Sequence, residues 1–210
     1  SGKKVAEFEK LFSEYIGTAY GVACNSGTAA LHMSLLSLGI GPGDEVIVPP
    51  MSFFATVSAV LMVGATPVFS DVDAIGNMSY QSLSPLVNEN TKAIIPVHFY
   101  GYPCDIDKIC DFANKYQISV IEDCAQAHGA SLNTGQKVGS FGRANCFSFF
   151  ATKNMTTIEG GIITTDDPEV YRKCKLIRSH GMTDRDTHSV LGYNYRMTEL
   201  NAAVGLEQLK

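Results

Sequence analysis

The sequence predicts a three-layer α/β protein, in which helices cover both faces of a mostly parallel sheet of about seven strands. Three observations support this fold class. Short apolar, β-branched runs alternate with helix-length segments from residue 20 onward. Runs such as residues 93–97 are apolar almost throughout, which is typical of parallel strands buried on both faces. No repeat or linker-like tract interrupts the alternation.

The size and composition fit a single large core. The chain has 210 residues, of which 45% are hydrophobic and 18% charged, against about 25% charged in a typical soluble protein. A chain of this length buries enough surface to fold without disulfides or metals. The 16 basic and 21 acidic residues give a net charge of −5, with no basic cluster, which argues against a nucleic-acid partner.

The expected elements follow one another with few gaps. The strands are expected over 20–24, 45–49, 67–72, 93–98, 118–122, 145–150 and 161–165. The helices are expected over 4–15, 26–38, 53–63, 105–116, 168–179 and 196–210. The helix over 105–116 has an apolar stripe opposite a charged face, as in a helix that lies on a sheet. This stripe consists of Ile106, Ile109, Cys110, Ala113 and Tyr116.

The domain boundaries follow from this order. Residues 1–19 are expected to form an N-terminal helix, residues 20–195 the main domain, and residues 196–210 the start of a helix that leads away from it. The six cysteines contain no C-x-x-C pair, so we expect reduced, buried thiols. Together with a charged start that lacks an apolar stretch, they predict a cytoplasmic protein without a signal peptide.

One uncharged stretch, residues 46–70, needs to be compared with a membrane span. Prolines and a glycine divide it into short pieces. Its helical part, residues 53–63, would rise only about 16 Å, whereas the hydrocarbon core of a bilayer is about 30 Å thick. We therefore expect a buried helix and no membrane partner.

Ligands of open parallel sheets bind beyond the carboxyl ends of the strands, so the residues at those ends are the candidates. Ser26, Gly27 and Thr28 follow the first expected strand and begin a helix. Free N–H groups and the helix dipole favour an anion at such a position. Because Ser26 is also a common N-cap residue, the residues alone leave a cap and a phosphate site as alternatives.

A carboxylate and an amine occupy two further strand ends. Asp123 ends an apolar run, where it needs a cation or hydrogen-bond donors. It could be a metal ligand, an acid/base group, the partner of a ligand cation, or a structural N-cap or turn residue. Lys153 follows a strand that contains three phenylalanines, and an apolar surround favours a neutral, nucleophilic amine. An anion site, a carboxylate and an amine together match the needs of pyridoxal phosphate.

The sequence resembles the DegT/DnrJ/StrS sugar aminotransferases, which have the type I pyridoxal-phosphate fold. The resemblance runs almost from end to end. It rests on the stretches NSGTAAL (25–31), GDEVIVP (43–49), GATPVF (64–69), PVHFYG (96–101), EDCAQAHGA (122–130), FSF (147–149), TKN (152–154) and NYRM (194–197).

This resemblance implies a role for each candidate residue. Lys153 would form the Schiff base with pyridoxal 5'-phosphate, and Asp123 would pair with the pyridine nitrogen. Asn194 would reach the phosphate in the neighbouring subunit of a homodimer with shared active sites. The other implied cofactor contacts are Gly27, Thr28 and Ser148 on the phosphate, Gln126 beside the 3-hydroxyl group, and Phe53 over the ring.

The implied activity is transfer of an amino group from an amino acid, L-glutamate, to a keto group of a nucleotide-linked deoxy sugar, as in amino-sugar and polysaccharide biosynthesis. Relatives with histidine at the lysine position are dehydratases, so Lys153 indicates transamination. The sequence departs from the family at Ile158, where glycine is common, and this predicts a reshaped turn after Lys153. Family members also continue past position 210 into a smaller domain, so the alternative is a non-catalytic or truncated binding or regulatory protein on this fold.

Two other enzyme classes fit the sequence poorly. A nicotinamide-binding Rossmann protein needs a glycine-rich turn between its first strand and helix, whereas the glycines at 39–43 precede a strand. A zinc enzyme needs ligands at set spacings, and the five histidines show none. Most of them are expected to be structural histidines with hydrogen-bond partners, and no metal is expected.

Overall fold

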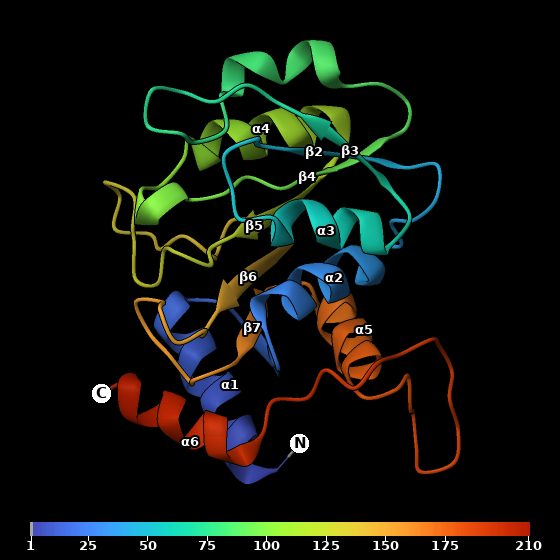
Figure 1. Cartoon of the computed structure of the whole chain (residues 1–210), viewed down its shortest axis with the longest axis vertical. Helices are drawn as coiled ribbons and strands as arrows, with labels where there is room; N and C mark the ends of the chain where they lie inside the picture. Colours follow the sequence, from blue (N-terminus) through green and yellow to red (C-terminus); the bar gives the residue numbers. More distant parts are fainter. Residues whose placement is uncertain (1) are drawn as a thin grey trace.

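The structure is a computed structural model that describes residues 2–210. A seven-stranded sheet forms its centre (Figure 1). The strands are β1 (Tyr20–Cys24), β2 (Glu45–Val48), β3 (Thr66–Phe69), β4 (Thr91–Ile94), β5 (Ser119–Asp123), β6 (Ala144–Ser148) and β7 (Gly161–Thr165). Their order is β1-β7-β6-β5-β4-β2-β3. All pairs from β3 to β6 are parallel, and β7 runs antiparallel to both β1 and β6. The predicted fold class is confirmed.

Six α-helices surround the sheet (Figure 1). They are α1 (Lys3–Ile16), α2 (Gly27–Ser37), α3 (Ala55–Met62), α4 (Ile106–Tyr116), α5 (Pro168–Arg178) and α6 (Glu199–Gln208). Three short 3-10 helices complete the list: η1 (Tyr80–Ser82), η2 (Ser84–Leu86) and η3 (Phe99–Gly101). Each expected helix is present within three residues of its predicted ends.

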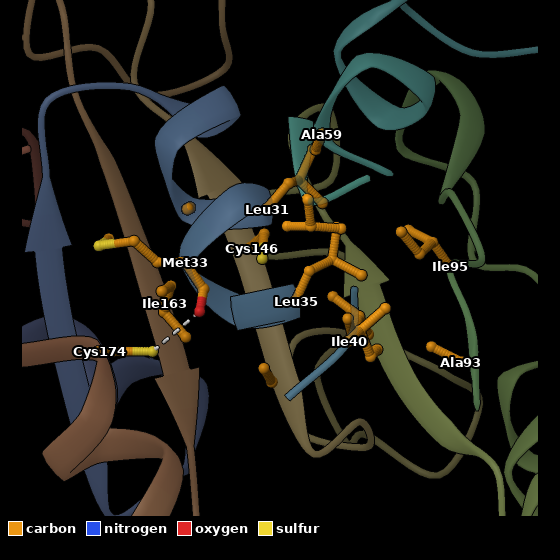
Figure 2. Packing of buried hydrophobic residues seen from close by; sticks show 14 of the residues in the cluster. Leu31, Met33, Leu35, Ile40, Ala59, Ala93, Ile95, Cys146, Ile163 and Cys174 are labelled. Atoms are coloured by element: carbon orange, nitrogen blue, oxygen red, sulfur yellow. Dashed lines mark hydrogen bonds between the residues drawn. The ribbon is translucent and has the colours of Figure 1, made fainter. Parts of the chain in front are cut away.

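One face of the sheet is covered by α2, α3 and α5. Leu31 and Leu35 of α2 reach toward Ala59 of α3 and toward Ile95, which directly follows β4 (Figure 2). The Cys174 thiol of α5 donates a hydrogen bond to the carbonyl of Met33 at 3.7 Å, which ties α5 to α2. Helix α2 is apolar nearly all round because it is buried between the sheet and these two helices.

The opposite face is covered by α1 and α6 over the β1, β7 and β6 side, and by α4 over the other side. Successive strand residues point to opposite faces, so Cys146 belongs to the α2 cluster and Phe147 to the α1 cluster. Phe12 of α1 packs edge-on against Phe147 and Phe149, with ring centroids 5.0 and 5.2 Å apart. This alternation positions the side chains at the strand ends on defined faces.

The expected apolar stripe of α4 is wrong in part. Ile106, Ile109 and Ala113 are buried as predicted, but the fourth large contact is Phe112, and Tyr116 is 40% exposed. Cys110 is only half-buried. The reason is that Phe112 lies one turn beyond Ile109 and joins the buried cluster against the sheet. Tyr116 only contacts Phe112, with the two rings tilted and their centroids 4.7 Å apart.

All six cysteines are free thiols, and all but Cys110 are buried, which agrees with the expected reduced state. No helix within residues 2–210 has the length and apolar character that a membrane crossing requires.

Candidate active site

The carboxyl ends of the strands meet at a cavity of about 320 Å³. Its lining comes from the last residues of β5 and β6 and from the segments that follow β1, β2, β4, β5 and β6, which are far apart in the sequence. Seven of the eight predicted site residues line this one cavity: Gly27, Thr28, Phe53, Asp123, Gln126, Ser148 and Lys153. The tertiary structure therefore brings the predicted anion site, carboxylate and amine together.

The start of α2 provides N–H donors to the cavity. The Ser26 hydroxyl accepts a hydrogen bond from the Ala29 N–H at 3.1 Å, so Ser26 is the N-cap. The Ala30 N–H bonds the Ser26 carbonyl. Within the described residues, this leaves the N–H groups of Gly27 and Thr28 without a protein partner, at the positive end of the helix dipole. The cap and the anion site that the sequence left as alternatives are compatible with each other.

Gly27 lets α2 approach the end of β6 closely. A Cβ on Gly27 would lie only 2.7 Å from the Ser148 Cβ, a distance that real structures do not show. Any larger residue at position 27 would therefore push the helix start away from Ser148. The two candidate backbone donors and the Ser148 hydroxyl consequently line the same end of the cavity.

Asp123 lies at the bottom of the cavity and is only 4% exposed. One carboxylate oxygen accepts a hydrogen bond from the Thr56 hydroxyl at 2.8 Å, and the other accepts one from the Ala125 N–H at 3.1 Å. Burial raises the pKa of Asp123, while these two donors and the nearby charge of Lys153 act in the opposite direction. A cation bound beside Asp123 would add to the interactions that favour the carboxylate.

Lys153 is half-buried and lines the cavity that Asp123 also lines. No ion pair involves its amine within the described residues, so the amine is not bonded to the Asp123 carboxylate, although its charge acts on it. Gln126 is oriented by the Tyr100 N–H, which donates to the side-chain oxygen of Gln126 at 2.8 Å. This bond leaves the NH₂ group of Gln126 as a donor at the cavity.

Two aromatic rings line the cavity near solvent, Phe53 at 72% exposed and Phe150 at 44%. Asn194, in contrast, does not line the cavity of its own chain. It is exposed, pairs with Ser179 in an isolated bridge, and its carbonyl accepts a hydrogen bond from the Asn25 side chain.

Sequence reasoning missed several lining residues. It also missed Thr56, which lies behind the lining but bonds Asp123 across 67 positions of the sequence and is itself bonded to the Ser52 hydroxyl at 2.6 Å. No local pattern identifies it, since it lies within an apolar helix. Val97 was detectable, because it follows β4 at the same edge and pairs with Asp123. Phe150, Thr152 and Glu159 also line the cavity.

A buried, hydrogen-bonded pair of side chains, His98 and Glu122, fixes the end of β5 behind Asp123. His98 and Glu122 are both fully buried, with His98 Nε2 and the Glu122 carboxylate 2.9 Å apart. The Glu122 carboxylate also accepts hydrogen bonds from the N–H groups of Gly139, Phe141 and Gly142 at 2.7–3.0 Å. Burial opposes the charge on Glu122, but His98 and these donors outweigh it and lower the pKa of the carboxyl.

This pair resembles a metal site only in composition. The ligand atoms of His98, Glu122 and Cys124 lie within 4.8 Å of one another. However, His98 Nδ1 already accepts the Cys104 N–H at 3.2 Å, and Glu122 already accepts four donors. The cluster therefore serves to hold the loop over 139–142 against β5.

Replacing Glu122 by glutamine is expected to lower the free energy of unfolding by about 2–4 kcal/mol, because the amide NH₂ group must then face a backbone N–H donor in a buried site. Urea unfolding followed by circular dichroism measures this loss. Glu207→Gln is the control, since the Glu207 side chain is 71% exposed. Equal urea midpoints for the two variants would contradict the stabilising role assigned to Glu122.

Ile158 has a left-handed backbone with φ of +72°, and its side chain is 59% exposed. A β-branched residue is strained in this conformation. The turn after Lys153 thus uses the very position at which the sequence departs from the common glycine. The Ile158 N–H donates to the Thr156 hydroxyl at 2.9 Å, which helps to hold the turn.

Ile158→Gly is expected to raise the free energy of unfolding by about 0.5–1 kcal/mol, because relief of strain exceeds the added chain entropy of glycine. Thermal unfolding measures the change. Ile75→Gly is the matched control, since Ile75 is a similarly exposed loop isoleucine outside the positive-φ positions, and it should be destabilising. A lower melting temperature for Ile158→Gly would refute the strain argument.

His128 is an exception to the expectation that most of the histidines have hydrogen-bond partners. Both of its ring nitrogens are shielded from solvent and have no hydrogen-bond partner within the described residues. The ring packs between Phe147 and Phe149, with centroids 5.4 and 5.5 Å away. Burial lowers the pKa of His128 to about 4, so it is neutral at pH 7.

The fold and the site define an α/β protein that places an anion-binding helix start, a buried carboxylate and a lysine amine at the carboxyl edge of a mostly parallel sheet. Comparison with known proteins places it more closely. The chain belongs to the DegT/DnrJ/EryC1/StrS aminotransferase family, whose model matches residues 1–210.

Individual relatives show the same likeness. The chain is 46% identical over 212 residues to GDP-perosamine synthase of Caulobacter vibrioides, which covers 100% of this chain and 57% of the relative. It is 52% identical over 190 residues to UDP-N-acetyl-3-dehydro-alpha-D-glucosamine 3-aminotransferase of Acidithiobacillus ferrooxidans, and the match covers 90% of this chain and 51% of the relative. The PLP form of a putative sugar aminotransferase of Streptococcus pneumoniae superposes with a TM-score of 0.93 at 36% identity, and the match covers 100% of this chain and 59% of that structure. The chain thus spans little more than half the length of these relatives.

Proposed function

We propose that the chain is the cofactor-binding part of a pyridoxal-phosphate-dependent aminotransferase. The enzyme would move an amino group from L-glutamate to the keto group of a nucleotide-linked deoxy sugar. The observation that carries this proposal is the convergence of the α2 start, Asp123 and Lys153 on one cavity. The nucleotide-sugar enzymes among its relatives support the acceptor class.

The lining residues fit pyridoxal phosphate group by group. The free N–H groups of Gly27 and Thr28, with the Ser148 hydroxyl, suit a phosphate. Asp123 suits a protonated ring nitrogen, and the NH₂ group of Gln126 suits the oxygen of the 3-hydroxyl group. Phe53 would cover the ring face. The cavity volume of about 320 Å³ lies at the lower end of the range for ligand pockets.

Each residue then has a defined task. Bound pyridoxal phosphate supplies the electron sink that transamination requires. Asp123 holds a proton on the ring nitrogen, and such an ion pair at about 4 Å is worth about 4 kcal/mol at an effective dielectric constant near 20. Lys153 moves a proton at the substrate Cα, which requires its amine to be neutral at that step. Phe53 and Phe150 limit the access of water to the cavity.

The active enzyme is proposed to be a cytoplasmic homodimer with shared active sites. The segment over 180–192 extends away from the body of the molecule (Figure 1), and Asn194 directly after it lies outside the cavity of its own chain. This placement leaves Asn194 available to the phosphate in a second copy. Phe53 and its neighbour Phe54 are exposed beside the cavity, at 72% and 66%, and would be covered in a dimer. The free thiols support a reducing compartment.

Cofactor titration tests the function directly. The protein is mixed with pyridoxal phosphate, the visible absorbance is recorded, and borohydride reduction followed by peptide mass spectrometry locates the modified residue. We expect the modification on Lys153, and loss of the absorbance with formation of 2-oxoglutarate on addition of L-glutamate. Modification spread over surface lysines, without a saturable absorbance, would refute the proposal. Saturable binding at Lys153 without glutamate conversion would instead support the second candidate, a non-catalytic binding or regulatory protein on this fold.

A further inference from the structure

A second hollow adjoins the cofactor cavity at Lys153. It has a volume of about 390 Å³ and is lined by Tyr100, Gln126, Thr152, Lys153 and Asn154. Three of these residues, Gln126, Thr152 and Lys153, line both spaces. The amine therefore stands at the boundary between the enclosed cavity and an open hollow, whose wall combines hydroxyl, amide and amine groups with one aromatic ring.

Tyr100 has an unusual conformation at this hollow. Its φ is +49° with ψ of +26°, a left-handed backbone that strains a residue with a large side chain. Its side chain is 83% exposed, so burial of the ring does not offset the strain. Strained residues that contribute little to folding concentrate at sites where a ligand is bound.

The turn that carries Tyr100 is held from several directions. The side chain of Asn77, which is buried, accepts the Phe99 N–H at 2.9 Å and donates to the Tyr102 carbonyl at 3.2 Å, so it clamps both ends of the turn. The Tyr100 N–H is bonded to Gln126 from the cavity side. These bonds fix the backbone of the turn, and with it the point at which the Tyr100 side chain leaves the chain, before any ligand arrives.

We propose that this hollow binds the sugar of the amino-group acceptor, with the Tyr100 ring as the surface on which the sugar packs. The inference rests on the proposed function, because it locates the acceptor of that reaction. A sugar ring has an apolar C–H face and a polar edge of hydroxyl groups. The Tyr100 ring matches the face, and the side chains of Gln126, Thr152 and Asn154 match the edge. Lys153 at the boundary is then in reach of the keto carbon.

The test uses two substitutions at Tyr100 and two nucleotide sugars that lack the reactive keto group, UDP-N-acetylglucosamine and GDP-mannose. Calorimetric titration of the protein loaded with pyridoxal phosphate gives their dissociation constants. For the probe that wild type binds, Tyr100→Gly should raise the dissociation constant by at least tenfold. The melting temperature of this variant should be unchanged or higher, because glycine relieves the strain. Tyr100→Phe should stay within about threefold of wild type, because it keeps the ring. Tyr102→Ala is the control, since Tyr102 is 57% exposed and is held only through its backbone.

Each outcome bears on one proposal. An unchanged dissociation constant in Tyr100→Gly overturns the inference, and so does failure of wild type to bind either probe although it converts glutamate. A change of oligomeric state in Tyr100→Gly with unchanged probe binding also overturns it, and assigns the ring to a contact between copies. Failure of wild type to convert glutamate refutes the proposed function instead.

Discussion

Lys153→Ala is expected to abolish trapping of pyridoxal phosphate by borohydride. It should also lower the rate of glutamate conversion by about 10²–10⁴-fold, which is the usual contribution of a general acid–base group to the rate. The reason is that Lys153 contributes the amine of the cavity that Asp123 also lines. Phosphate contacts at the α2 start remain, so reversible binding of the cofactor should persist. Absorbance titration measures binding, and single-turnover kinetics with L-glutamate measures the rate.

Two further substitutions make this result specific. Lys153→Arg keeps a positive charge near Asp123 but offers no amine that condenses with an aldehyde, so it should bind the cofactor without being trapped. Lys173→Ala removes a partly exposed lysine of α5 and should behave as wild type. Turnover of Lys153→Ala at the wild-type rate would remove the chemical basis of the proposed function.

Asp123→Asn is expected to retain bound cofactor but to lose about 10³-fold in rate. An amide cannot hold the proton on the ring nitrogen, and the lost interaction of about 4 kcal/mol corresponds to roughly three powers of ten. Stopped-flow measurement of the glutamate reaction gives the rate. Asp111→Asn on the exposed face of α4 is the control. A rate within tenfold of wild type would show that Asp123 does not act on the ring.

The same substitution should not destabilise the cofactor-free protein. Burial raises the pKa of Asp123 in the folded state above its unfolded value. The stability that the folded state gains from the protonated carboxyl is therefore present below the unfolded pKa, near 3.9, and is lost as pH rises through the folded pKa. Asparagine removes this loss at neutral pH. It can accept from the Ala125 N–H and donate to the Thr56 hydroxyl, which rotates. Urea unfolding at pH 7 should show equal or greater stability.

Local patterns predicted much of this protein. The order of strands and helices followed from the periodicity of apolar residues, and the candidate residues at positions 27, 123 and 153 followed from their places at strand ends. The helix start at Ser26 was also detectable, because an N-cap depends only on residues within one turn. Family resemblance supplied the individual roles.

The sequence by itself thus determined the succession of elements, the fold class and which strand ends carry polar groups, because these depend on contacts between near neighbours in the chain. Only the tertiary structure decided that Thr56 bonds Asp123, that β7 runs against its neighbours, and that Phe112 replaces Tyr116 in the core. It also decided the left-handed backbones of Tyr100 and Ile158. These features depend on which distant segments pack together, and a local period carries no information about that choice.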